Sequence, residues 1–282
     1  MVDIFNLLLS FFKSFASIFS AILAALGLMI PENPPENPVV ISPVAVFSSY
    51  DNIRTVEGGC TDGRYVYQVL IDTDAPVGAV PSKIVKIDSS DWSTVAVSEE
   101  LNIDHANDMT YDEANKLLVV CNNKPNYTTI TYVDPGSLTV KGTKTLGTKI
   151  YSIAYVGSEK CWYAGISNSA DIVRFDENFK ETGVIDNPEN LYTRQSLATD
   201  GTYLYSLYYN PNIVYRYSLT GEPQGHIVLP DTTNEAENIF FLGGKMYVGF
   251  NILGPAGGFV ARIDNPDFSV EIPIPAPSVK AA

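Results

Sequence analysis

The chain has 282 residues, of which 45% are hydrophobic, and its formal net charge is −14. This length and apolar content suit one folded domain with a sizeable core and an appendage. The acidic surface repels phosphate backbones, so we expect no nucleic-acid partner. The three cysteines, Cys60, Cys121 and Cys161, form no Cys-x-x-Cys pair, which argues against a structural zinc site, and we expect three buried thiols.

The N-terminal stretch is almost free of charge, since Lys13 is the only charged residue from Ile4 to Ile30. A helix of this length is long enough to cross a bilayer. Small and polar residues follow one side of such a helix, and apolar residues with coiled-coil spacing follow the other. We therefore expect a hydrophobic α-helix over residues 1–30, which is either a membrane anchor or one member of an oligomeric bundle.

A proline-rich segment, residues 31–38, comes next. Such a composition is extended and semi-rigid, so we expect a spacer between the helix and a domain over residues 39–282 that ends in a short tail. Lys13 near the start of the apolar stretch and the acidic residues after it predict that the domain lies outside the cytoplasm.

The rest of the chain repeats one short pattern of alternating residues that ends in an acid or a serine. The five copies are Ile84–Asp88, Ile130–Asp134, Asp171–Asp176, Val214–Ser218 and Val260–Asp264. Their last residues lie 42 to 46 positions apart. A fixed period of this size is typical of a repeat architecture.

Each repeat contains four predicted strands. Two strands joined by a tight turn such as Asp62-Gly63 or Asp200-Gly201 precede each copy of the pattern, and one strand follows it. The predicted last strands are Thr94–Val97, Leu138–Val140, Gly183–Ile185, His226–Leu229 and Ser269–Ile272. We expect His226 at the surface, and Val39–Phe47 as an extra strand that closes a ring.

Five four-stranded units at this period resemble the blades of a β-propeller, and the resemblance covers about four fifths of the chain. The sequence does not contain the signature motif of any particular propeller family. The segment Asp104–Tyr111 is similar to strand-opening segments of secreted bacterial and phage propellers. We therefore expect an all-β, five-bladed propeller preceded by a single N-terminal hydrophobic α-helix.

The resemblance implies that the first strand of each blade lines a central channel. Aligned on their turns, these strands place Glu57, Asn107, Tyr151, Gln195 and Glu237 in one column and Gly58, Asp108, Ser152, Ser196 and Asn238 in the next. His105 and Arg194 lie nearby at the predicted channel mouth. The candidate ligand-binding ring consists of Glu57, His105, Asn107, Asp108, Tyr151, Arg194, Gln195, Glu237 and Asn238.

Three interpretations of this ring remain open. The channel is a water-filled tube whose polar groups satisfy one another. Alternatively, it binds a sugar, a peptide end or a cation such as calcium, with Glu57, Asp108 and Glu237 as oxygen ligands. In the third, two of these carboxylates act as acid and base in cleaving a glycoside.

We favour binding over catalysis, because the sequence has two histidines, no nucleophile elbow and no phosphate-binding loop. The preferred function is a surface-anchored recognition or scaffold module whose extracytoplasmic propeller binds a glycan or protein partner. Residues 4–30 would contact the membrane or partner helices, in a homo-oligomer or a larger complex. The alternatives are a virion or phage appendage protein for host attachment, with bundled helices, and a glycan-cleaving enzyme.

Overall fold

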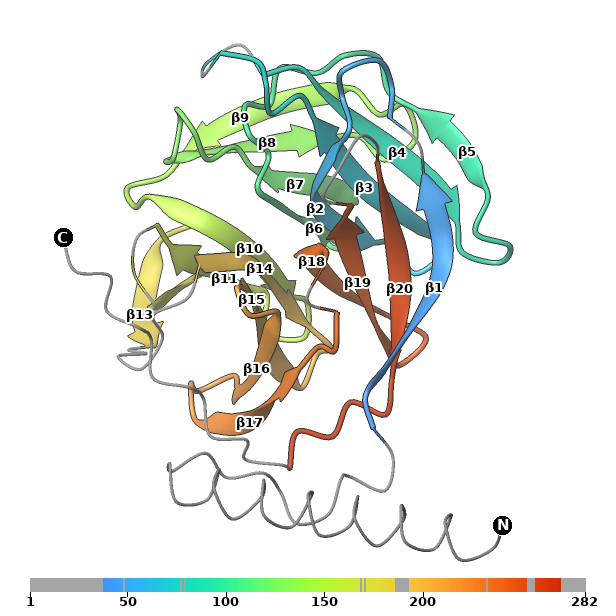
Figure 1. The fold of residues 1–282 in the computed structure, drawn as a ribbon. Helices are drawn as coiled ribbons and strands as arrows, with labels where there is room; N and C mark the ends of the chain where they lie inside the picture. The colour runs from blue at the N-terminus through green and yellow to red at the C-terminus, as the bar shows by residue number, and fades with distance from the viewer. Residues whose placement is uncertain are drawn as a thin grey trace, which may run out of the picture. The chain divides into compact units, whose positions relative to one another are not determined.

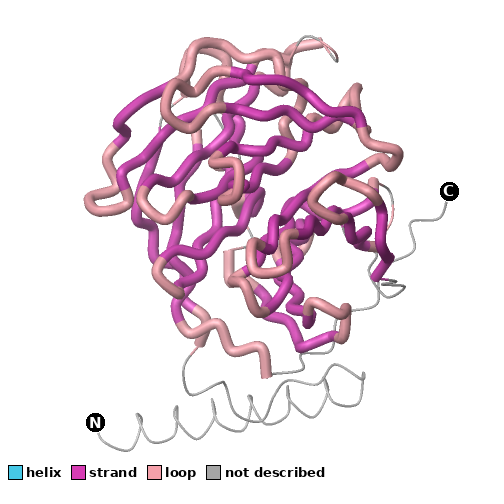
Figure 2. The backbone as a smooth tube through the Cα atoms, turned by 180° about the vertical axis from the view of Figure 1, so that it is seen from behind, coloured by secondary structure: helices cyan, strands magenta, loops and turns pink. Residues whose placement is uncertain are grey.

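The computed structural model describes residues 38–47, 49–76, 78, 80–167, 169, 171–185, 193–231, 233–252 and 257–269. The expected helix over residues 1–30 lies outside them. Within the described ranges, no helix is long and apolar enough to span a membrane, and Figure 2 shows only strands and loops there.

The described residues contain twenty strands in five antiparallel sheets of four, which confirms the predicted five-bladed propeller (Figure 1). Blade 1 consists of β2 (Thr55–Thr61), β3 (Tyr65–Ile71), β4 (Ser82–Asp88) and β5 (Thr94–Val97). Blade 2 consists of β6 (Asp108–Asp112), β7 (Leu117–Cys121), β8 (Thr129–Val133) and β9 (Val140–Thr145). Blade 3 consists of β10 (Ile150–Val156), β11 (Cys161–Ile166), β12 (Ile172–Phe175) and β13 (Glu181–Ile185).

Blade 4 consists of β14 (Thr193–Thr199), β15 (Tyr203–Tyr209), β16 (Ile213–Ser218) and β17 (Pro223–Val228). Blade 5 combines the end of the chain with its beginning: β18 (Glu235–Leu242), β19 (Lys245–Asn251), β20 (Gly258–Asp264) and β1 (Val40–Phe47).

Side-chain bonding fixes the turns between the first two strands of blades 1 and 4. Asp62 Oδ1 accepts the backbone amides of Arg64 and Tyr65 at 2.9 and 2.7 Å, and Gly63 has a φ of 92°. Asp200 and Gly201 repeat this arrangement in blade 4. The Asp holds the turn and the Gly adopts the left-handed conformation at little steric cost, so the chain reverses where the sequence predicted.

The apolar core is divided among the five interfaces between neighbouring blades. Five clusters of buried side chains are present in the described part of the chain, and each joins residues from two adjacent blades. Between blades 1 and 2, for example, Tyr67 and Ile84 pack in one cluster with Met109 and Leu118. None of these five clusters joins more than two blades.

Strand β1 closes the ring, as predicted. It pairs antiparallel with β20 from Val40 opposite Asp264 to Phe47 opposite Gly258, and Ser42 Oγ donates to Asp264 Oδ2 at 2.8 Å. The outer position that the sequence assigned to residues 269–272 is therefore occupied by β1, and residues 270–272 lie outside the described ranges.

Two side-chain predictions have opposite outcomes. The three cysteines are buried and free, as expected. The prediction that His226 is a surface residue is wrong, because it lies within β17, is only 8% exposed and packs against the Tyr215 ring at 5.3 Å. The outer strand begins earlier than its apolar run, at Pro223, so His226 falls in its middle.

Closure by β1 should have a measurable energetic signature. Phe47 is 5% exposed in the interface between blades 5 and 1, whereas its neighbour Val46 is 76% exposed. Phe47→Ala should lower the free energy of unfolding by about 3–5 kcal/mol in urea titration, because it leaves a cavity. Val46→Ala should change it by about 0.5 kcal/mol or less. Equal losses in the two variants would contradict closure by a packed β1.

Candidate axial binding site

Backbone bulges aim the predicted ring residues at the axis. In four of the five first strands the pairing with the second strand shifts register at the ring position, between Val56 and Gly59, Ile150 and Ser152, Arg194 and Ser196, and Ala236 and Asn238. A bulge of this kind leaves a residue unpaired and redirects its side chain. In blade 2 the strand starts only at Asp108, so Asn107 precedes it.

An inner layer of polar residues ties the blades together across the axis, and Asp108 is its centre. Its Oδ1 accepts the Met109 amide at 3.0 Å and the Ser196 hydroxyl at 2.8 Å. Its Oδ2 accepts the backbone amides of Ile153 at 2.9 Å and Leu197 at 3.0 Å. One fully buried carboxyl group thus joins blades 2, 3 and 4.

The remaining blades complete this layer, which we call the hub. Ser196 Oγ accepts the Ile239 amide of β18 at 3.3 Å, and Asn238 Nδ2 donates to the Glu57 carbonyl at 2.6 Å. The Gly58 amide donates to the Ala106 carbonyl at 3.3 Å. A Cβ on Gly58 would lie 2.6 Å from the Asp108 carbonyl carbon, so this contact requires glycine. The hub residues Gly58, Asp108, Ser196 and Asn238 thus link blades 1, 2, 4 and 5.

This bonding removes Asp108 from the candidate metal ligands. Burial raises its pKa to about 8, against the lowering effect of the four donors, and those donors occupy both oxygens. No group of three or more His, Cys, Asp or Glu side chains among the residues that the structure describes is arranged to hold a metal. The calcium interpretation with Asp108 as a ligand therefore does not fit the geometry.

Each residue of the other predicted column directly precedes a residue of the hub column in the sequence. Asn107 Nδ2 donates to the carbonyls of Tyr151 and Gln195, both at 3.1 Å, and Gln195 Nε2 donates to Glu235 Oε1 at 2.9 Å. Except for Tyr151, which is half-buried, the five column residues are less than a tenth exposed: Glu57, Asn107, Gln195 and Glu237.

Three carboxyl groups gather in this layer, and we call Glu57, Glu235 and Glu237 the axial acid cluster. Burial raises the pKa of Glu57 well above its ordinary 4.5, and the charge of Glu235 raises it further. Burial also raises the pKa of Glu237, with the charges of Glu57 and Glu235 and a hydrogen bond to Glu235 adding to the effect. Burial raises the pKa of Glu235 as well. Glu57 and Glu237 are buried and Glu235 is half-buried, so burial and mutual repulsion both favour protonated carboxyls in this cluster.

His105 contacts the cluster but does not neutralise it. Its Nε2 lies 3.4 Å from Glu57 Oε1. Burial, followed by the charge of Lys124, lowers the pKa of His105 to about 4, so the ring is uncharged at neutral pH. No Lys or Arg of the described ranges lies within 4.0 Å of the three carboxyls.

The loop that carries His105 is strained. Its neighbours Asp104 and Ala106 have φ values of 55° and 50°, which side chains disfavour. Asp104 Oδ2 holds the loop by accepting Asn122 Nδ2 at 2.8 Å and Asn126 Nδ2 at 3.0 Å. Such strain is concentrated at functional sites.

Arg194 is buried and bonds to groups of two blades. Its guanidinium donates to Tyr208 Oη at 2.8 Å, Ser206 Oγ at 3.0 Å and the Asp171 carbonyl at 3.1 Å. These bonds join blades 3 and 4, and only 5% of the residue is exposed. We therefore assign Arg194 a role in the blade interface.

Sequence reasoning missed Glu235 and Asn123. Glu235 stands two residues before Glu237 on one strand, and an alternating acid pair in a channel-lining strand was a visible signal. Asn123 follows β7 with a φ of 59°, is fully buried and donates through Nδ2 to Asn107 Oδ1 at 3.0 Å. Its contact depends on how blade 2 meets the axis, so the sequence offered no signal for it.

Comparisons with known proteins support the architecture. No protein-family model matches the chain, and no curated protein matches its sequence. Among solved structures, it is similar to a glutaminyl cyclase from Myxococcus xanthus with a TM-score of 0.55, at 11% identity over 79% of this chain and 99% of that one. It is also similar to a luciferin-regenerating enzyme with a TM-score of 0.51, at 12% identity over 80% of this chain and 95% of that one. At these identities the likeness shows the propeller fold alone.

The hub assignment predicts that replacing Asp108 with the isosteric, uncharged Asn strongly lowers the free energy of unfolding. In Asp108→Asn, the amide nitrogen would face two donors whichever oxygen it replaces, so the free energy of unfolding should fall by about 3 kcal/mol. Asp134→Asn is the matched control, because Asp134 Oδ1 alone accepts the turn amides of Gly136 and Ser137. It should cost about 0.5 kcal/mol or less in the same urea titration. Equal costs would exclude the hub role.

The axial acid cluster predicts a distinctive pH dependence. The raised pKa values mean that the folded state binds more protons than the unfolded state from about pH 4.5 upward, so stability falls as pH rises. The double variant Glu57→Gln/Glu237→Gln cannot titrate there. The unfolding free energy of this variant minus that of wild type should therefore increase as pH rises above about 4.5, at up to ~1.4 kcal/mol per pH unit per group. A gain independent of pH would contradict the raised pKa values.

Proposed function

We propose that the propeller is a non-enzymatic recognition module that binds a ligand carrying a protonated amine at the axial acid cluster. The observation that carries this proposal is the charge balance of the site. Glu57 and Glu237 are 5% and 3% exposed, and His105, the one basic side chain within ion-pair distance among the described residues, is uncharged at neutral pH. A buried group of acids without a cation is satisfied either by protons or by a positively charged ligand.

An ammonium group suits the site better than a metal ion does. The described residues hold no metal-ligating group of three, whereas an amine needs acceptors at ordinary hydrogen-bond lengths. Asn123 Oδ1 is a buried acceptor that receives no hydrogen bond from the described residues. Burial raises the pKa values of Tyr151 and Tyr209, and the charges of the acid cluster raise them further, so both residues lie near the cluster. Aromatic rings of this kind can contact a cation.

The amine can belong to a protein terminus, a lysine side chain or an amino sugar, so the proposal keeps the expected glycan or protein partner. Its setting is a separate proposal. Residues 4–30 would anchor the chain in a membrane at the cell surface or bundle in a virion appendage, and they lie outside the described ranges. The apolar sequence alone supports this part.

A second function, acid–base catalysis, is favoured by the pairing of Glu57 with His105. The pKa of the carboxyl is raised and the imidazole is neutral, so one can donate a proton and the other accept one. His105 also lies on the strained loop described above. A glycan that contains an amino sugar is the substrate class that combines both proposals.

The proposal predicts preference for amines over neutral analogues. In calorimetric titration, glucosamine should bind about tenfold or more tightly than glucose, and a dipeptide with a free amino terminus more tightly than its acetylated form. Binding should release protons, which titration in buffers of different ionisation enthalpy detects, because the cation replaces protons on Glu57 and Glu237. Equal affinity for charged and neutral probes, or none for either, would exclude an ammonium site.

Matched variants separate binding from catalysis. Glu57→Gln/Glu237→Gln should lose the amine preference, while Asp134→Asn, which alters an exposed turn, should keep it. Wild type incubated with chitosan oligosaccharides should produce no new reducing ends. Reducing ends formed by wild type, and lost in the double variant with binding kept, would replace the recognition proposal with the enzymatic one.

A further inference from the structure

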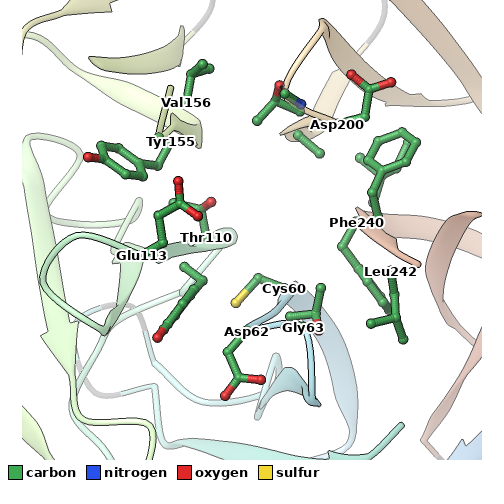
Figure 3. A pocket seen from close by; sticks show the side chains of 18 of the residues that line it. Cys60, Asp62, Gly63, Thr110, Glu113, Tyr155, Val156, Asp200, Phe240 and Leu242 are labelled. Carbon is green, nitrogen blue, oxygen red and sulfur yellow. Dashed lines mark hydrogen bonds between the residues drawn. The ribbon is translucent and has the colours of Figure 1, made fainter. Parts of the chain in front are cut away.

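A cavity opens at the other end of the first strands from the axial acid cluster. It has a volume of about 800 Å³, and the residues that follow the hub in all five blades line it, down to the turns at the strand ends. Figure 3 shows Cys60, Thr110, Glu113, Asp200 and Phe240 placed round this central space. We call this cavity the funnel.

The hub separates the funnel from the axial acid cluster. The funnel-lining residues Met109, Leu197 and Ile239 directly follow Asp108, Ser196 and Asn238. Their backbone amides donate to hub oxygens, at 3.0, 3.0 and 3.3 Å. The funnel therefore does not depend on the amine proposal, and a ligand in one site does not contact the other.

The funnel combines partly exposed apolar residues with an acidic rim. Its half-buried apolar lining residues are Tyr111, Phe241 and Leu242. Asp62, Glu113 and Asp200 come from three different blades, and Lys116 is the one Lys or Arg in the lining. Asp62 and Asp200 are fixed by turn amides and by the hydroxyls of Tyr67 and Tyr205, both at 2.8 Å. The Glu113 carboxyl group lies against the backbone of Gly157, and a side chain at position 157 would displace that carboxyl group.

The rim leaves its backbone accessible. A Cβ on Gly63, Gly201 or Gly243 would meet no other atom within 4 Å, so open space lies in front of these turns. A partner can approach them closely. A volume of this size exceeds what one ion or one side chain fills, and it matches sites that enclose a larger ligand.

From this geometry we propose that the funnel docks a protruding loop of a partner protein that carries basic and apolar residues at its tip. Charge complementarity supports a basic tip, because three rim carboxylates face a single lysine. The half-buried Tyr111, Phe241 and Leu242 of the lining supply apolar surface, which favours a loop over a free polyamine.

The test uses the full-length chain and a disulfide-closed hairpin peptide with Lys-Leu-Arg at its tip, followed by fluorescence anisotropy. The peptide should bind, and binding should weaken as salt is added. A peptide with Glu in place of Lys and Arg should not bind. Spermine should not displace the bound peptide at equal concentration. Absence of binding, binding of both peptides, or displacement by spermine would overturn the proposal.

Charge-only variants locate the site. Asp62→Asn/Glu113→Gln/Asp200→Asn keeps the oxygens that accept the turn amides, and it should weaken binding about tenfold or more. The matched control, Asp88→Asn/Asp134→Asn, alters the same kind of turn outside the funnel and should bind as wild type does. Equal weakening in both would overturn the proposal.

Two further variants cover a folding defect and the axial site. Ser158→Arg adds a cation at the exposed rim and should also prevent binding. Glu57→Gln/Glu237→Gln should bind the peptide normally while it loses the amine preference, so the two sites succeed or fail separately. Peptide binding that survives Ser158→Arg, or that is lost with the axial variant, would contradict docking in the funnel.

Discussion

The structure depends on a carboxyl group that three blades share. Each apolar cluster joins two neighbouring blades, and polar contacts join the inner strands of more than two. Asp108 supplies them through four accepted hydrogen bonds, and Ser196, Asn238 and Gly58 extend the layer to blades 5 and 1. A buried network of this kind specifies one arrangement, because each unpaired member would be costly.

The hub also divides the channel chemically. On one side, Glu57 and Glu237 are buried, with His105 as the basic neighbour of Glu57, and burial raises the pKa values of both carboxyls. On the other side, the rim residues Asp62 and Asp200 of the funnel are hydrogen-bonded within their turns, which fixes their carboxyl groups. Carboxyl side chains thus stand on both sides of the hub, and in the axial cluster burial raises their pKa values.

The sequence predicted the blades, their hairpin turns and closure by β1, because period, alternation and Asp-Gly turns are local properties. It also placed Glu57, Asn107 and Glu237 near one another, since aligned strands of a propeller share an axis. It could not predict that both carboxyl oxygens of Asp108 accept hydrogen bonds from neighbouring blades, or that Arg194 bonds across a blade interface. These contacts depend on the distances between blades. The bulges that aim Glu57 and Glu237 likewise arise from pairing, and a two-residue alternation does not reveal them.

The central functional claim is that the axial acid cluster holds protons at neutral pH until a cation displaces them. Infrared spectroscopy of the carboxyl C=O band tests it directly. At neutral pH, wild type should show more protonated-carboxyl absorbance than Glu57→Gln/Glu237→Gln, in which Asp108 is unchanged, and this excess should decrease when glucosamine, but not glucose, is added. If wild type and the double variant show the same protonated-carboxyl absorbance, these carboxyls are already ionised at neutral pH, and the account is contradicted.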